Sequence, residues 1–456
     1  MRVRRDLMRK LLLGSTAVAA AALFAPQGAL AQGADPFLPP GPPMVSHRAL
    51  EVRVGGYFRF NYNFTEQGQN SANKDSGVGV PVAGVATTPN TSARLGKSDF
   101  ASDAEIHVVA NGKATNGLRY GVAIELEVDY NDGTYSPYSG SRVRSPKTGL
   151  GTDEMWMYVA GGFGQVRFGD EDNAWNLMSV GHVANFGTGG ADGDWFDSVT
   201  ATHRAATTFT ADSGDNTKII YLSPQFYGFD VGASFAFNTG EGEDTGCILS
   251  TVTSDCDRAN AYSGTPRRRN EVFGIARWRG SFGGVGLQAA IGGMTADATK
   301  GQQVINSGVA SSATSAKPMW MGYGGLQATA YGFTLGGEYY WGQANNSFVP
   351  LVRGAVDTRN MNEVFAGASY TWGPVSVGAN FYDLQSAGAQ GIAAGRREQV
   401  WSVGATYVVA PGLTIVTDYS DIYRKEAGYN FISGTAGSAN NKVTSKVFIL
   451  GTRIAF

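Results

Sequence analysis

The 456-residue sequence has few of the residues from which most catalytic and metal sites are built. It contains four histidines and two cysteines, and no two histidines have the spacing of a zinc-binding motif. The nucleophile elbow G-x-S-x-G is missing, and the glycine clusters lack the spacing of a phosphate-binding loop. We therefore expect no catalytic site, no metal and no other cofactor.

Charge and long apolar runs are also scarce. Asp, Glu, Lys and Arg make up 16% of the chain, whereas soluble domains contain about 25%. Residues 1–31 carry five basic residues and one acidic residue, and without them 31 basic residues remain against 37 acidic ones, a formal net charge of −6. This negative charge excludes nucleic acid as a partner. Beyond residue 31, no apolar run reaches the roughly 20 residues of a membrane-spanning helix.

The first 31 residues have the three-part layout of a secretory signal peptide. A basic start precedes the apolar stretch LLLGSTAVAAAALFA, and Ala29 and Ala31 provide small residues for cleavage. The alternative is an N-terminal membrane anchor, but the apolar stretch is too short to span. We predict that residues 1–31 are removed on export, and that the Pro-rich residues 32–49 precede a folded region at 50–456.

Cys247 and Cys256 are the two cysteines of the chain. In an exported protein, a pair this close in sequence is expected to form one disulfide that closes a loop. Metal binding is the alternative, but no histidine lies nearby and the spacing matches no common zinc pattern.

Alternation of apolar and polar residues runs through the region 50–456. It is clear in LEVRVGGYFRFNYNF (50–64), in GLRYGVAIELEVDY (117–130) and in the final KVTSKVFILGTRIAF (442–456). A period of two indicates β-strands that have one apolar face and one polar face, because successive side chains point to opposite sides.

Short turns and long polar loops alternate strictly between these segments. Seven turns contain Gly or Pro, such as GGFG at 161–164 and APG at 410–412, and eight longer polar stretches separate the resulting pairs. This order predicts about 16 strands. A soluble β-sandwich has no reason to keep its long loops on one edge, and so large an apolar face would aggregate in water. We predict an all-β, antiparallel transmembrane barrel with short periplasmic turns and long external loops.

Several of these segments resemble the general diffusion porins of Gram-negative outer membranes. They include NGLRYGVAIELE (116–127), GGFGQVRFGDED (161–172), KIIYLSPQFYGFDVGASFAF (218–237) and the last strand, which ends in an aromatic residue. The resemblance implies a homotrimer of passive channels for small hydrophilic solutes and ions, located in the cell outer membrane among lipid and lipopolysaccharide. It also implies that Phe456 matches the C-terminal signal recognised by the barrel-assembly machinery. The loop near 131–151 is a candidate for reaching over a neighbouring subunit.

The third long loop, which begins at residue 171, resembles the constriction loop of these porins. Such a loop folds into the lumen and carries a Phe-Gly-Gly-like element followed by acidic residues. Phe186 and Gly187 match this element, and Thr188 stands where a second Gly is common. The acidic residues that follow are Asp192, Asp194 and Asp197.

Inward parity assigns a second group of residues to the pore wall: Arg53, Arg59, His107, Arg119, Arg167 and Arg453. Arginines that face loop carboxylates would create a transverse field across the pore. Arg59 and Arg167 lie nearest the middle of their predicted strands and are the first candidates. We expect Arg53 and Arg453 closer to the periplasmic mouth.

The expected function is passive diffusion with a mild preference for cations, since the chain and its third loop are acidic, although the wall arginines oppose this preference. Two alternatives stay open. One is a substrate-specific outer-membrane channel, and the other is a surface adhesion or structural barrel with a blocked lumen. Saturable solute flux would favour the first alternative, and absence of conductance would favour the second.

Overall fold

The structure is a computed structural model, and a defined part of the chain is described. It comprises residues 50–67, 96–128, 150–200, 203–205, 213–240, 261–262, 266–301, 304–306, 309–311, 316–345, 348–351, 359–389 and 392–456. The predicted signal peptide and the Pro-rich segment fall outside these ranges, as do Cys247, Cys256 and residues 129–149 of the second loop.

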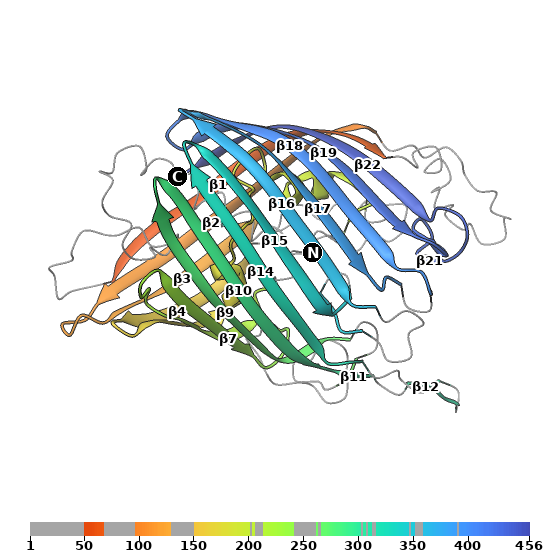
Figure 1. The fold of residues 1–456 in the computed structure, drawn as a ribbon, viewed down its shortest axis with the longest axis horizontal. Coiled ribbons are helices and arrows are strands. Elements are labelled where there is room, and N and C mark those ends of the chain that lie inside the picture. The colour runs from red at the N-terminus through yellow and green to blue at the C-terminus, as the bar shows by residue number, and fades with distance from the viewer. Residues whose placement is uncertain are drawn as a thin grey trace.

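Sixteen antiparallel strands close into one barrel, which confirms the prediction from the turns and loops. Their order in the chain is also their order around the barrel. They are β1 (Glu51–Gln67), β2 (Ser98–Lys113), β3 (Arg119–Val128), β4 (Leu150–Gly161), β5 (Gly164–Asp170), β6 (Thr217–Leu222), β7 (Phe229–Ala236), β9 (Arg268–Phe282), β10 (Val285–Ala298), β14 (Met319–Ala330), β15 (Phe333–Gln343), β16 (Met361–Trp372), β17 (Val375–Ser386), β18 (Arg396–Ala410), β19 (Leu413–Glu426) and β22 (Lys442–Ala455). Figure 1 shows β14 to β19 side by side across the front of the barrel, all tilted in the same sense.

Smaller elements belong to the long connections. Two-stranded sheets pair β8 (Ala261–Tyr262) with β11 (Lys300–Gly301), β12 (Val304–Asn306) with β13 (Val309–Ser311), and β20 (Tyr429–Asn430) with β21 (Thr435–Ala436). The helical elements are α2 (Ala174–Met178), the 3-10 helix η1 (Gly190–Asp192) and α3 (Trp195–Ser198). Within the described ranges, no helix has the length and apolar character of a membrane span.

The last strand closes the barrel onto the first. β1 pairs with β2 on one side and with β22 on the other, so Arg59 has Asp103 and Arg453 as its two cross-strand neighbours. The backbone of Phe456 continues this ladder, since it exchanges hydrogen bonds of 3.0 and 3.1 Å with Gly56. Closure pairs the two edge strands, which would otherwise present unsatisfied backbone groups.

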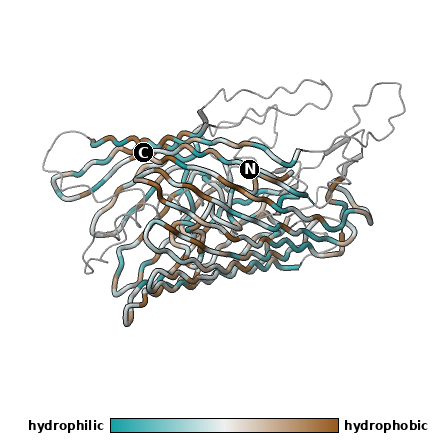
Figure 2. Tube along the Cα trace, turned by 90° about the horizontal axis from the view of Figure 1, so that it is seen from above, coloured by the Kyte–Doolittle hydropathy of each residue, from teal (hydrophilic) through white to brown (hydrophobic). Residues whose placement is uncertain are grey.

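Each strand has one face toward the outside and one toward the lumen. On β1, Phe58 and Phe60 are exposed, whereas Tyr57, Asn61 and Asn63 are buried. The same alternation continues around the barrel, and Figure 2 shows brown and teal alternating along the strands. An apolar outer face and a polar lumen are the arrangement that lipid on one side and water on the other require.

Exposed aromatic side chains form two rows on the outer face. One row follows the short turns and includes Phe163, Phe226, Tyr227, Phe282, Tyr331, Phe333 and Trp372. The other lies toward the long loops and includes Phe64, Phe100, Phe237, Trp320 and Trp341. Rows of aromatic residues at two heights are typical of the two interfaces of a membrane barrel.

Tight hairpins produce the short turns. Gly283 and Gly284, which join β9 to β10, have φ angles of 57° and 83°. Positive φ at both central residues matches the right-handed twist of the flanking strands, and glycine adopts it without steric cost. These hairpins place all the long loops at the opposite end of the barrel.

Candidate functional site

The third loop leaves β5 and turns into the barrel. We call residues 171–200 the L3 segment. Its first helix, α2, begins after Asn173, whose side-chain oxygen accepts hydrogen bonds from the backbone N–H groups of Trp175 (2.8 Å) and Asn176 (3.3 Å). This cap satisfies two N–H groups that the helix leaves unpaired. It also fixes the direction in which α2 enters the lumen.

Trp175 anchors α2 to the wall. Its side chain is fully buried, and its indole N–H donates to the carbonyl oxygen of Gly274 on β9 at 2.8 Å. The ring packs against Phe273 and Tyr323, with ring centroids 5.3 and 5.7 Å away. Burial of a large aromatic ring with its one polar group paired is a strong attachment.

Polar wall side chains bind the backbone of the next stretch. The Tyr323 hydroxyl on β14 accepts from the N–H of Val180 (2.6 Å) and donates to its carbonyl (2.7 Å). On β17, Asn380 accepts from the N–H of Ala191 (2.7 Å) and donates to the carbonyl of Gly189 (3.1 Å). The loop backbone thus finds inside the barrel the hydrogen bonds that buried peptide groups require.

The Phe-Gly-Thr element lies against β17 and β19. Phe186 is fully buried against Gly378 on β17, where an added Cβ would overlap its ring. Gly187 has a φ of 54° and leaves no space for a Cβ beside the carboxylate of Asp418. The N–H of Thr188 donates to this carboxylate on β19. The Thr188 hydroxyl also accepts a hydrogen bond of 3.1 Å from the N–H of Asp194. A threonine at this position, in place of a second glycine, therefore adds a hydrogen bond within the loop.

Asp194 forms the last anchor, on β1. Its carboxylate accepts from Arg59 Nη1 at 2.5 Å and from Asn61 Nδ2 at 2.6 Å. Arg59 also contacts Asp103 Oδ2 on β2 at 2.9 Å. Burial raises the pKa of Asp194, and the positive charge of Arg59 counteracts that rise. The predicted arginine and the predicted loop carboxylate are therefore in contact, instead of facing each other across an opening.

Asp192 lies in a second charged contact with His182. The imidazole is 3.4 Å from Asp192 Oδ2 and 3.3 Å from Glu338 Oε2 on β15, and it stacks on Phe365 with a centroid distance of 4.2 Å. Burial lowers the pKa of His182, but the hydrogen bonds and charges of the two carboxylates outweigh it and raise the pKa to about 9. At neutral pH, His182 is therefore a cation between two anions.

This charge state predicts how the stability of L3 attachment depends on pH. Because the folded pKa of about 9 lies above the ordinary value of 6.5, the contribution of His182 is complete below pH 6.5 and is lost as pH rises through 9. A shift of this size corresponds to on the order of 3 kcal/mol. We expect the difference in unfolding free energy between wild type and His182→Gln to shrink between pH 6 and pH 10, as measured by denaturant titration. A difference that does not change with pH would refute this charge state.

The other predicted wall residues take different positions. Arg167 on β5 is buried, donates to Glu171 at 2.7 Å and stacks over the Trp156 ring. Arg453 packs over the ring of Tyr57, at 4.4 Å from its centroid, directly beside Arg59 in the β1–β22 pair. Three further wall residues lie elsewhere: Arg53 pairs with Glu51 at 2.7 Å, Arg119 is exposed at the turn end of β3, and His107 is 2.9 Å from Glu105. The loop carboxylate Asp197 is exposed on α3.

Several wall residues that bind the L3 segment or its partners were not predicted as site residues, among them Asn61, Asp103, Ser234, Tyr323, Glu338, Asn380 and Asp418. All of these have the inward parity of their strands. A polar residue with inward parity was the available signal, but parity does not indicate which inward residues meet the loop.

The chain is similar to known proteins both in sequence profile and in fold. The sequence profile of the Gram-negative porins matches residues 16–447. No curated protein matches the chain. Among solved structures, a substituted form of the porin of Rhodopseudomonas blastica has 16% identity and a TM-score of 0.47, covering 89% of this chain and 100% of its own. A triple mutant of the same porin has 17% identity and a TM-score of 0.46 at the same coverage. Because the family profile spans most of the chain, this protein belongs to the Gram-negative porins and is an outer-membrane channel.

Proposed function

We propose that this porin is a general diffusion pore for small hydrophilic solutes and ions, and that the L3 segment narrows it. The observation that carries the proposal is the path of the segment inside the barrel. Its hydrogen bonds reach β9, β14, β15, β17, β19 and β1. A barrel of this size encloses a water-filled lumen, so a segment held inside it sets the size of solute that passes.

We place the open passage between the L3 segment and the inner faces of β2, β3 and β4. The anchors named above lie on the remaining part of the wall. The inner faces of β2 and β3 carry Glu105, His107, Glu125 and Glu127 at the height of the barrel's middle. These side chains are polar, as small hydrophilic solutes require of a pore wall, and each is at most 9% exposed in the structure.

The sign of the lumen charges supports a preference for cations as part of this proposal. Among the described residues, the buried charged side chains are predominantly acidic, and the buried cationic ones are Arg167, Lys218, Arg268, Arg396, Arg424 and the protonated His182. Arg59 and Asp194 are in contact, so their opposite charges cancel at a distance. The carboxylates on β2 and β3 then determine the potential that a permeating ion meets.

Reversal potentials under a KCl gradient test this preference. We expect the reversal potential of the wild-type channel to have the sign that indicates a preference for K⁺ over Cl⁻. The double variant Glu125→Gln/Glu127→Gln should shift this potential toward zero. The matched control is Asp383→Asn, which removes a carboxylate that is paired with an exposed arginine at 2.9 Å. Clear Cl⁻ preference in the wild type would contradict the proposal.

Assembly and partners belong to the same proposal. The chain would lose residues 1–31 on export and form a homotrimer, with Phe456 recognised by the barrel-assembly machinery. The exposed Phe456 side chain on the closing strand supports this role. Lipopolysaccharide phosphates would contact the basic run at the start of β9 through Arg267 and Arg269, because Arg268 is buried and donates to Glu271 at 3.1 Å.

A further inference from the structure

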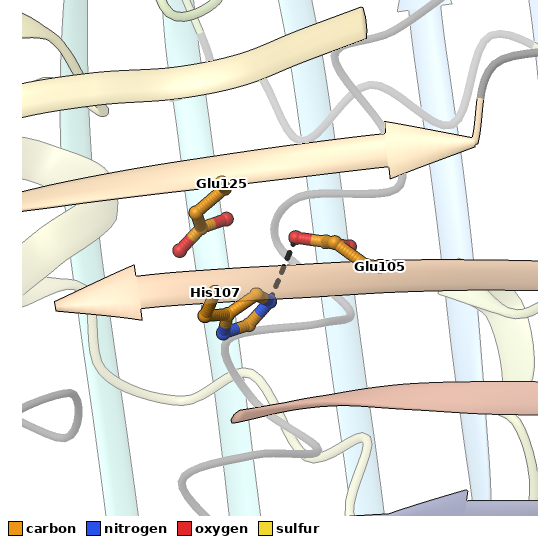
Figure 3. A group of neighbouring side chains, drawn as sticks. All are labelled: Glu105, His107 and Glu125. Carbon is orange, nitrogen blue, oxygen red and sulfur yellow. Dashed lines mark hydrogen bonds and ion pairs between the residues drawn. The ribbon is translucent and has the colours of Figure 1, made fainter. Parts of the chain in front are cut away.

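An imidazole and two carboxylates meet on the inner face of β2 and β3. His107 and Glu125 are directly opposite each other in the β2–β3 register, and Glu105 precedes His107 by two residues on the same face. Figure 3 shows the three side chains converging from the two neighbouring strands. One possible ligand atom from each lies within 4.8 Å of the other two, and His107 Nε2 is 2.9 Å from Glu105 Oε1.

We propose that Glu105, His107 and Glu125 bind a divalent transition-metal cation of the Zn²⁺ type at the wall of the pore. Zn²⁺ accepts imidazole nitrogen and carboxylate oxygen as ligands at about 2.0–2.2 Å, which separates the ligand atoms by roughly 3.5 Å in a tetrahedral set. The three ligand atoms lie within 4.8 Å of one another, so side-chain rotations that move them closer by about 1 Å give that spacing. Water then completes the coordination. The imidazole selects against Mg²⁺ and Ca²⁺, which prefer ligand sets made of oxygen.

The strand register gives a second reason for a cation at this place. Glu105 also lies directly opposite Glu127, so three carboxylates and one imidazole occupy four neighbouring inward positions. Like charges directly opposite each other in an antiparallel pair destabilise it. A bound dication offsets this repulsion and stabilises the pairing of β2 with β3. The sequence predicted no metal because no two histidines have the spacing of a zinc-binding motif. A site built from one histidine and two carboxylates on neighbouring strands does not require that spacing.

The position of the site predicts an effect on the current. On the other side of β2, the cross-strand neighbour of Glu105 is Tyr57, and that of Asp103 is Arg59. The metal therefore lies beside the place where L3 is attached to β1. Two positive charges at this height reduce the attraction that the lumen carboxylates exert on cations. This effect on the current depends on the proposed function, whereas the binding itself does not.

Calorimetric titration of the purified, folded protein with Zn²⁺ tests the binding. We expect one site per chain in the wild type, and a loss of affinity of more than about tenfold in His107→Ala, since even residues that only support a metal ligand contribute about 10–100-fold. His107→Gln and Glu125→Gln serve as second variants, with folding checked by circular dichroism. His182→Gln is the matched control, because His182 also lies between two carboxylates. Unchanged affinity in folded His107 variants, loss of affinity in the control alone, or no binding to the wild type would overturn the assignment.

Channel recordings then separate the two proposals. Zn²⁺ is expected to shift the reversal potential toward Cl⁻ in the wild type, EDTA to reverse the shift, and Mg²⁺ at the same concentration or His107→Ala to show none. Binding in the calorimeter without any ion current would support the metal site and contradict the proposed pore. A current that Zn²⁺ changes equally in wild type and His107→Ala would contradict the metal site alone.

Discussion

Replacing Arg59 by Ala is expected to release the α3 end of the L3 segment from β1. Asp194 is only 5% exposed and would lose its charged partner. Removing one member of a buried ion pair costs about 3–5 kcal/mol, because the remaining charge is left without compensation. The release should appear as faster hydrogen exchange and proteolysis at residues 190–200 and as noisier open-channel current. Adding Asp194→Asn removes the uncompensated charge and should recover most of the loss.

Arg53→Ala is the matched control for this prediction. Arg53 lies on the same strand with the same inward parity, but its side chain and that of Glu51 are 37% and 34% exposed. Exposed pairs contribute about 0–1 kcal/mol. Equal effects of Arg59→Ala and Arg53→Ala on the exchange of residues 190–200 would mean that the Arg59–Asp194 pair does not attach the loop.

Replacing Gly378 by Leu is expected to displace the L3 segment from β17. A Cβ at this position would overlap the ring of Phe186, which is fully buried. Moving that ring out of its site loses about 3–5 kcal/mol of packing, comparable to truncation of a buried Phe. The segment then shifts from the wall into the passage, so single-channel conductance should fall.

Two further variants test that interpretation. Gly324→Leu on β14 is the control, since a Cβ there meets nothing within 4 Å, and it should leave the conductance unchanged. Adding Phe186→Ala to Gly378→Leu vacates the space that the leucine needs and should restore the position of the loop. A conductance in Gly378→Leu equal to that of the wild type would show that contact with β17 does not position L3.

The barrel was predictable because its signals are local. A period of two gives the strand faces, and the strict order of short turns and long loops gives the strand count. Closure also follows, since β22 has an apolar outer face and ends beside β1. None of these signals depends on contacts between distant parts of the sequence.

The path of the third loop was not predictable in the same way. Its anchors are inward residues on strands far away in sequence, such as Asp418, which is 230 residues from Thr188. The sequence predicted that Arg59 and Asp194 belong to one site, but their distance depends on how closely the loop approaches β1. Arg167 was a candidate partner for Asp192, Asp194 and Asp197, yet it pairs with Glu171, which lies only four residues away at the start of the L3 segment.

The central claim is that the folded protein is an open, water-filled pore held narrow by L3. Single-channel conductance of the purified protein in planar bilayers, measured over a series of KCl concentrations, tests it most directly. We expect a conductance that rises in proportion to salt, in insertion steps of three equal levels, and that falls in Gly378→Leu. A correctly folded barrel that leaves the bilayer closed would contradict the pore and favour an adhesion or structural role instead.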